Sequence, residues 1–279
     1  MTALPTRVEH QHPPLLGGDM RRFWSLTWTL ATTDWKLRFY GSVLGYLWTL
    51  VRPFLFFGVI LFVFTQIAHL DANVPHYGVY ILFALVLFQF FAEATGNSVN
   101  SLVTRESLLR KIRFPRLVIP LAVILTALFN LGMTLIAVTI FAVASGVYPS
   151  VGWLALVPLV AILGMLATGV GLLLSALFVR YRDVQPIWDV VSQMLFYFSP
   201  ILYVSTLVPA AYQRPYLVNP IACVLTEMRH AVVDSGAPHV WTAIGGAERL
   251  LIPGGIVVVL LALGLLVFSR EAPRVAENL

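Results

Sequence analysis

The sequence predicts an all-α polytopic membrane protein, and three observations support this fold class. Of the 279 residues, 59% are hydrophobic and 11% are charged, against about 25% charged in a typical soluble domain. The apolar residues gather into six runs, each long enough to cross a bilayer core about 30 Å thick. The runs do not alternate polar and apolar residues as barrel strands do, so each is expected to be a helix that pairs its own backbone groups.

The N-terminal region is expected to lie outside the membrane core. Residues 1–20 are polar and rich in Pro and Gly, which predicts a mobile cytosolic tail and no removable signal peptide. Residues 21–42 predict an amphipathic interfacial helix, because Trp and basic residues favour the headgroup layer. Its broad apolar face comprises Phe23, Trp24, Trp28, Ala31, Trp35 and Phe39.

Residues 43–279 predict one transmembrane domain with six spans. The spans are expected at about 43–68, 78–99, 117–144, 153–179, 186–207 and 250–269. Between the last two, Asn219 and Pro220 supply an N-cap and a first-turn proline for a short helix. At about 15 residues this helix is too short to cross, so it lies at the outer surface or re-enters the membrane. Its Glu227 and Arg229 either face the exit or are surface charges.

The distribution of Lys and Arg predicts that both termini lie in the cytosol. Fifteen of the 18 precede or edge the first span, lie in the connections after the second and fourth spans, or lie in the C-terminal tail. Three lie in the connections on the other side. Because basic residues accumulate in cytosolic loops, the turn that holds Arg180, Arg182 and Asp183 is cytosolic. Acidic residues contribute little to orientation, so we expect Asp183 to pair with Arg182 and order this turn.

Acidic residues inside spans are costly unless solvated or paired. Glu93 and Asp189 both lie near the cytosolic boundary, which favours solvation or pairing with a basic residue over a proton relay. The single cysteine, Cys223, cannot form an internal disulfide, and the six scattered histidines predict no metal site. Neither Lys36 nor Lys111 follows a phosphate-binding glycine loop, so this chain is not expected to bind ATP.

The connection after the second span, SLVTRESLLRKIRFPR (101–116), has two interpretations. Its apolar stripe and basic rim form either an anchor loop or a helix that docks in a groove of a soluble partner. The stripe comprises Leu108, Leu109 and Ile112, and the rim comprises Arg105, Arg110, Lys111 and Arg113.

Five segments in order resemble the membrane subunit of ABC-2-type exporters of the polysaccharide class, which move O-antigen, teichoic acid, capsular or cell-wall galactan chains. The resemblance covers about residues 30–268, and Arg52 departs from the uncharged polar residue that the family more often has there. The segments are FYGSVLGYLWTLVRP (39–53), LLRKIRFPRLVIPL (108–121), LLSALFVRYRDV (173–184), FSPILYV (198–204) and NPIACVLTEMR (219–229).

The resemblance implies a permease of a bacterial inner membrane that exports a lipid-linked polysaccharide, with a galactan on polyprenyl diphosphate as one candidate. It implies two copies of this chain and two of a separate ATPase, which holds ATP and Mg, with no nucleic acid involved. Arg180 would be free to meet the substrate. The coupling segment, which contacts that ATPase, would be residues 102–113. Its anchors would be Leu108, Leu109 and Ile112, and its orienting charges Arg105, Arg110 and Arg113.

A glycan needs a wet path, because stripping water from a hydroxyl without replacement costs on the order of 1–3 kcal/mol. Aromatic rings can lie against the C–H faces of sugars, although rings also pack cores and mark interfaces. The candidate rings are Phe54, Phe57, Phe62, Trp188, Phe196, Tyr197 and Tyr203. A small-residue row, Ala167, Gly171 and Ser175, packs either on a second copy or on a neighbouring span.

Two other function classes are open on sequence alone. The first is a polytopic membrane transferase acting on lipid-linked substrates, which usually shows acidic or histidine clusters at a membrane face; here no connection concentrates them. The second is an ABC-2 exporter of drugs or small lipids. The compact outer connections, of which the largest has about 40 residues, favour the polysaccharide branch.

Overall fold

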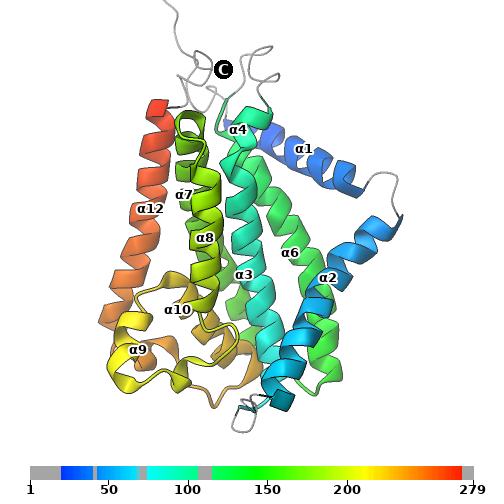
Figure 1. Cartoon of the computed structure of the whole chain (residues 1–279), viewed down its shortest axis with the longest axis vertical. Coiled ribbons are helices and arrows are strands. Elements are labelled where there is room, and N and C mark those ends of the chain that lie inside the picture. The colour runs from blue at the N-terminus through cyan, green and yellow to red at the C-terminus, as the bar shows by residue number, and fades with distance from the viewer. Residues whose placement is uncertain (1–19, 40–42, 68, 70–73, 106–114, 272–279) are drawn as a thin grey trace, which may run out of the picture.

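The computed structural model describes residues 20–39, 43–67, 69, 74–105 and 115–271 (Figure 1). In these residues all regular secondary structure is helical, which confirms the predicted class. The longer helices are α1 (Met20–Phe39), α2 (Val43–Phe62), α3 (Tyr77–Val99), α6 (Val118–Ala144), α7 (Leu156–Arg180), α8 (Val184–Tyr197) and α12 (Leu251–Glu271). Short segments are η1 (Val63–Ile67), α4 (Ser101–Thr104), η2 (Val151–Ala155), η3 (Ser205–Leu207), α9 (Ala210–Tyr216), α10 (Pro220–Met228), η4 (Arg229–Val233), α11 (Val240–Ile244) and η5 (Ala247–Leu250).

Five helical stretches in the described residues are long and apolar enough to cross a membrane. They are Leu50–Ile67, Tyr77–Val99, Val118–Ala144, Val151–Arg180 and Ala247–Glu271. The last four agree within three residues with predicted runs. The first is the second part of α2 together with its π-helical continuation, η1.

The fifth predicted run, 186–207, does not form a full-length helical span. Helix α8 ends at Tyr197, because Pro200 lacks an amide hydrogen and disfavours a helical conformation at Ser199. At about 1.5 Å per residue, its 14 residues extend about 21 Å, less than the roughly 30 Å of a bilayer core. The expectation of one continuous helix through residue 207 is therefore wrong.

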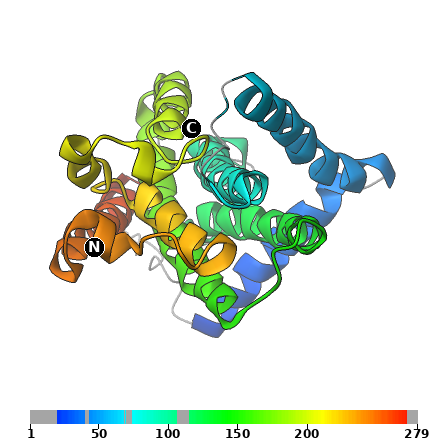
Figure 2. The ribbon, with the colours of Figure 1, turned by 90° about the horizontal axis from the view of Figure 1, so that it is seen from below.

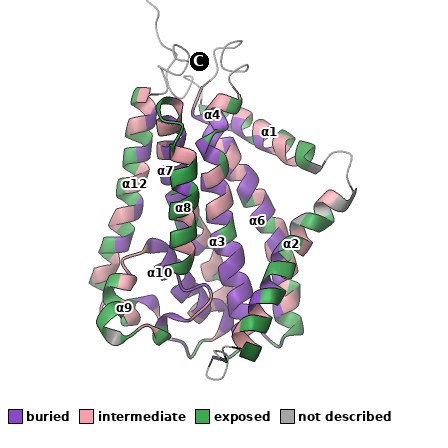
Figure 3. Ribbon diagram, in the orientation of Figure 1, coloured by how far each residue is buried: buried purple, intermediate pink, exposed green. Residues whose placement is uncertain are grey.

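Helix α3 lies at the centre of the bundle. Seen along the bundle, it lies between α2 and α6 on one side and α8 and α10 on the other (Figure 2). Of the residues in its most apolar stretch, 78% are buried. The corresponding share is 17% for α2 with η1 and also 17% for α12 (Figure 3). The outer helices therefore present apolar side chains outward, as expected where lipid or another subunit is the neighbour.

Helix α1 lies across one end of the bundle, which we call the α1 end, and packs on α6 (Figure 1). Its buried side chains are Phe23, Thr27 and Ala31, spaced four residues apart. Trp24 and Trp28 are 56% and 57% exposed. The buried stripe faces α6, and the Trp28 ring packs edge-to-face on Phe129 of the same helix with centroids 5.2 Å apart. The predicted apolar face therefore lies partly against α6, and its placement in the headgroup layer stays a prediction.

Small residues set the contacts of α7 inside the chain. Ala167, Gly171 and Ser175 are all buried, and a Cβ on Gly171 would come within 2.9 Å of Ser98 Oγ on α3. This row therefore packs on a neighbouring span, which was one of its two interpretations. On another side of α7, Gly169 brings the helix backbone against that of α12.

Candidate functional site

An ion pair fastens α1 to the centre of the bundle. Arg38 Nη1 donates to Glu93 Oε1 of α3 at 2.5 Å, and Asn130 Nδ2 of α6 donates to the same oxygen at 2.7 Å. Trp35 Nε1 of α1 donates to Asn130 Oδ1 at 3.1 Å. Glu93 is therefore paired with a basic residue, one of the two alternatives that the sequence predicted. Asp189 of α8 is exposed, and its Oδ1 accepts from Gln185 Nε2 at 3.1 Å.

A second ion pair joins α1 to the residue that follows α4. Arg105 Nη2 donates to Asp34 Oδ2, and the two side chains are only 20% and 26% exposed. Arg105 is the first of the charges predicted to orient an ATPase, and here it is engaged within the chain. The other predicted coupling residues, Leu108, Leu109, Arg110, Ile112 and Arg113, lie outside the described residues.

The two arginines of the charged turn at the α1 end lie close to aromatic rings. The Arg182 guanidinium lies 5.0 Å from the Phe178 ring centroid, and the Arg180 guanidinium lies 5.4 Å from that of Tyr181. Within the described residues neither arginine forms an ion pair with Asp183, so the predicted Arg182–Asp183 pair is wrong. Both arginines are exposed and can meet an anionic ligand.

The seven candidate rings do not form one surface. On α2, Phe57 is buried and Phe54 half-buried, and both pack edge-to-face on Phe141 of α6. On α8, Trp188 is buried and its Nε1 donates to Thr95 Oγ1 at 3.2 Å. These three candidates are packing residues in this structure.

Two of the remaining candidates, Tyr197 and Tyr203, lie with Tyr216 in a row of tyrosines beside α8. Phe196 packs on Tyr197 with ring centroids 5.3 Å apart, and Tyr203 Oη donates to the Tyr197 carbonyl at 2.9 Å. Tyr216 Oη donates to Tyr203 Oη at 3.2 Å, and these two rings are 6.2 Å apart. Phe62 is 61% exposed on α2.

Sequence reasoning missed Tyr216, because the short segment AAYQRPY has no apolar period that marks one face. Burial, with the hydrogen bond to Tyr203 as a smaller cause, raises the pKa of the Tyr216 hydroxyl well above its usual range. The hydroxyl therefore stays neutral and serves as a hydrogen-bonding group.

Helix α10 begins as predicted. Asn219 Oδ1 accepts from the amide of Ile221 at 3.0 Å, and Pro220 is the first helical residue. Asn219 Nδ2 also donates to Ser199 Oγ at 3.1 Å, which ties the helix to the turn after α8. All residues of α10 except Glu227 are buried. The helix therefore lies within the bundle, at the end opposite α1, which we call the α10 end (Figure 1).

The two charged residues of this segment hold the α10 end together. Glu227 Oε1 lies 3.1 Å from His239 Nδ1, and its Oε2 accepts from the amide of Val240 at 3.0 Å. Arg229 is 7% exposed, with its Nη2 3.5 Å from Asp234 Oδ2. Neither residue is a free surface charge, so that interpretation is wrong.

Comparison with known families identifies the architecture. Residues 25–233 match the family described as ABC-2 type transporter. The chain belongs to this ABC-2 type transporter family. The matched region runs from α1 to η4, so it includes both ion pairs, the charged turn and α10.

This ABC-2 permease is similar along most of its length to proteins named for O-antigen export and polysialic acid transport. It is 29% identical over 251 residues to the O-antigen export system permease protein RfbA of Klebsiella pneumoniae, covering 90% of this chain and 93% of that protein. It is 26% identical to the Myxococcus xanthus protein of the same name, over 94% and 98% of the two chains. The polysialic acid transport protein KpsM of Escherichia coli is 24% identical, over 71% of this chain and 77% of its own.

The only cysteine of the permease is expected to resist polar thiol reagents while the chain is folded. Cys223 is 9% exposed, its Sγ donates to the Leu217 carbonyl at 2.9 Å, and burial raises its pKa to about 12. The reactive thiolate is therefore roughly a thousandfold scarcer at neutral pH than for a free cysteine. Mass spectrometry after maleimide treatment should find the label in denaturant only, whereas Ser150→Cys at an exposed site should label when folded. Equal labelling of the folded and unfolded wild type would contradict this.

Proposed function

We propose that this ABC-2 permease is the membrane-spanning subunit of an ATP-driven exporter that moves a lipid-linked polysaccharide from the cytosol to the outer face of a bacterial inner membrane. The supporting observation is the similarity over 90% or more of the chain to O-antigen export permeases from two organisms. A cell-wall galactan on polyprenyl diphosphate is the specific cargo that we propose.

The proposed assembly has two permeases and two ATPases, with ATP and Mg held by the ATPases. Both termini lie in the cytosol, so the α1 end is cytosolic and the α10 end is outer. In support, α1 and the last turn of α12 lie at the same end of the bundle (Figure 1), which requires an even number of crossings. Helix α8 makes the sixth crossing together with the segment that follows it.

Charge placement is consistent with this direction of transport. Arg180 and Arg182 are exposed at the α1 end, where a diphosphate headgroup would enter from the cytosol. Guanidinium groups bind phosphate oxygens through strong, charge-assisted hydrogen bonds. In this proposal the two arginines bind the headgroup. The side of α8 next to the row of tyrosines faces the sugar chain.

Co-purification tests the proposed function. The permease is expressed with an ABC ATPase from a neighbouring gene, where one is found, and native mass spectrometry should find two copies of each. In cells that lack both subunits, surface glycan should return with the wild-type pair and not with the permease and an ATPase whose phosphate-loop lysine is replaced. Sugar transfer by the permease without any ATPase would instead establish the transferase class. ATP-dependent efflux of drugs with no effect on surface glycan would establish the drug exporter class.

The coupling segment, residues 102–113, is expected to depend on its apolar anchors. Leu108→Asp, in a variant that still reaches the membrane and binds its ATPase, should lower export and transport-linked ATP hydrolysis by about tenfold or more. The reason is that a buried interface anchor typically contributes over about 1.4 kcal/mol, a tenfold effect. Leu108→Met, which keeps an apolar side chain at the same position, is the matched control and should change neither quantity. Unchanged coupling in Leu108→Asp would remove this role.

A further inference from the structure

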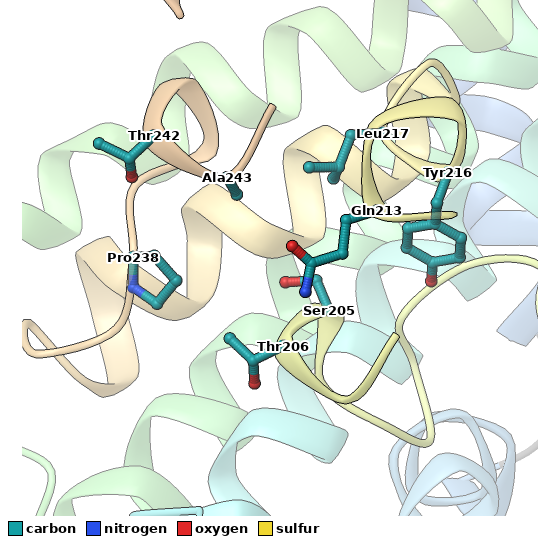
Figure 4. Close-up of a pocket in the computed structure, with 8 residues that line it drawn as sticks. All are labelled: Ser205, Thr206, Gln213, Tyr216, Leu217, Pro238, Thr242 and Ala243. Carbon is teal, nitrogen blue, oxygen red and sulfur yellow. The ribbon is translucent and has the colours of Figure 1, made fainter. Parts of the chain in front are cut away.

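A cavity of about 160 Å³ at the α10 end has an uncharged lining that combines polar and apolar groups. It lies between η3, α9 and α11 (Figure 4). Five of its eight lining residues carry hydroxyl or amide groups: Ser205, Thr206, Gln213, Tyr216 and Thr242. None of the eight is charged. A cavity of this kind suits a neutral ligand rich in hydrogen-bonding groups better than an ion or a hydrocarbon.

Several of these polar groups have hydrogen-bonding capacity left for a ligand. Ser205 is 6% exposed, yet its hydroxyl has no hydrogen-bond partner within the described residues. Gln213 Nε2 donates to the Val208 carbonyl at 2.9 Å, which holds the amide in place and leaves Oε1 as an acceptor. The exposed Thr206 hydroxyl likewise has no partner within the described part of the chain.

The cavity continues the row of tyrosines beside α8. Tyr216 lines it and meets Tyr203, whose hydroxyl in turn reaches the Tyr197 carbonyl. Rings in such a row can lie against the C–H faces of sugar units while the hydroxyls of the sugar stay hydrogen-bonded. The row therefore links the exposed end of α8 to a pocket of hydrogen-bonding groups.

We infer that this cavity is a binding subsite for one neutral sugar unit of the exported chain. The inference rests on the proposed function. The size limits the ligand, because drug-sized ligands occupy roughly 300–1,000 Å³ and this cavity is smaller. A hydrocarbon chain has a better place in the cavity of about 270 Å³ on the other side of α11, which is lined mainly by apolar residues of α7, α10 and α12.

Binding of simple sugars to the permease–ATPase complex in nanodiscs tests this subsite. The probes are galactose, glucose, mannose and N-acetylglucosamine, with galacturonate as the anionic comparison, followed by saturation-transfer NMR. At least one neutral probe should bind saturably. Ala243→Trp, which fills the cavity, should abolish the signal. Gln213→Leu and Ser205→Ala should each weaken binding about two- to tenfold, as expected for one lost hydrogen bond.

Matched controls separate this subsite from the proposed function. Gln66→Leu makes the same change at an exposed glutamine of η1 and should bind as wild type. Thr206→Val changes an exposed side chain at nearly constant volume, so a weaker signal there does not come from misfolding. The subsite is wrong if no neutral probe binds, if Ala243→Trp leaves binding intact, or if galacturonate binds more tightly. Export of glycan by the same complex would then leave the proposed function standing, whereas absence of any ATPase partner would overturn the function itself.

Discussion

Gly169→Ala is expected to lower the unfolding temperature of the purified permease, while Gly164→Ala in the same helix leaves it unchanged or slightly higher. A Cβ on Gly169 would lie 2.6 Å from the backbone nitrogen of Leu261 and 2.7 Å from its Cα. Backbone atoms of α12 cannot yield as a flexible side chain would, so the two helices must separate. Overpacking of this kind typically costs about 1–3 kcal/mol, which corresponds to a fall on the order of 5 °C for a chain of this size.

The control isolates the close approach from helix propensity. A Cβ on Gly164 meets nothing within 4 Å, and both substitutions gain the roughly 1 kcal/mol by which alanine favours a helix over glycine. Gly264 lies on the other side of the same contact, where a Cβ would overlap the Gly169 carbonyl oxygen. Gly264→Ala should therefore destabilise as well, and the double variant should lose less than the two single losses added together. Fluorescence-monitored unfolding in detergent measures the four variants and the wild type. Equal unfolding temperatures for Gly169→Ala and Gly164→Ala would show that α7 and α12 do not pack this closely.

Most of the helical architecture could be predicted from the sequence because a bilayer imposes length and hydropathy together. Helices α3, α6, α7 and α12 begin and end close to the predicted positions for this reason. The end of α8 was missed because FSPILYV is as apolar as a span, and hydropathy outweighed the local effect of Pro200. The pattern of α1 predicted an apolar face but not which residues are buried against α6, which are Phe23, Thr27 and Ala31.

The contacts of the candidate site depended on long-range packing. The sequence predicted a basic partner for Glu93, but nothing local indicated Arg38, 55 residues earlier. Arg182 and Asp183 are adjacent and opposite in charge, which suggested a pair, yet the chain turns after the end of α7 so that the Arg182 guanidinium lies 5.0 Å from the ring centroid of Phe178. The cap of α10 was predictable, since Asn219 and Pro220 act within their own turn.

The ion pair between Asp34 and Arg105 joins α1 to the proposed coupling segment. Asp34 and Arg105 are 71 residues apart in sequence, and their ion pair holds the first residue after α4 against α1. Arg38 of the same helix is held by Glu93 of α3. A movement of residues 102–113 would therefore reach α3 through α1 as well as through the direct connection at Asn100. The two ion pairs lie one helical turn apart on α1, so we propose that α1 links the coupling segment to the central helix.

Asp34→Arg should accordingly weaken the coupling between ATP hydrolysis and export. It places two guanidinium groups together in a partly buried site and removes a charge-assisted hydrogen bond of about 1.5–3 kcal/mol, so transport-linked ATP hydrolysis should fall about tenfold or more. The amount of permease in the membrane and the basal ATPase rate should stay near the wild-type values, because Glu93 and Arg38 still hold α1.

The reversed pair, Asp34→Arg with Arg105→Asp, separates the ion pair from each residue taken alone. It restores opposite charges across the same contact, so most of the lost coupling should return. Asp183→Asn removes an acidic charge at the same end of the bundle from a residue without an ion pair in the described structure, and it should leave coupling intact. If Asp34→Arg couples normally, or if the reversed pair stays as defective as the single variant, α1 is not a link in the transmission and motion passes to α3 by the direct connection alone.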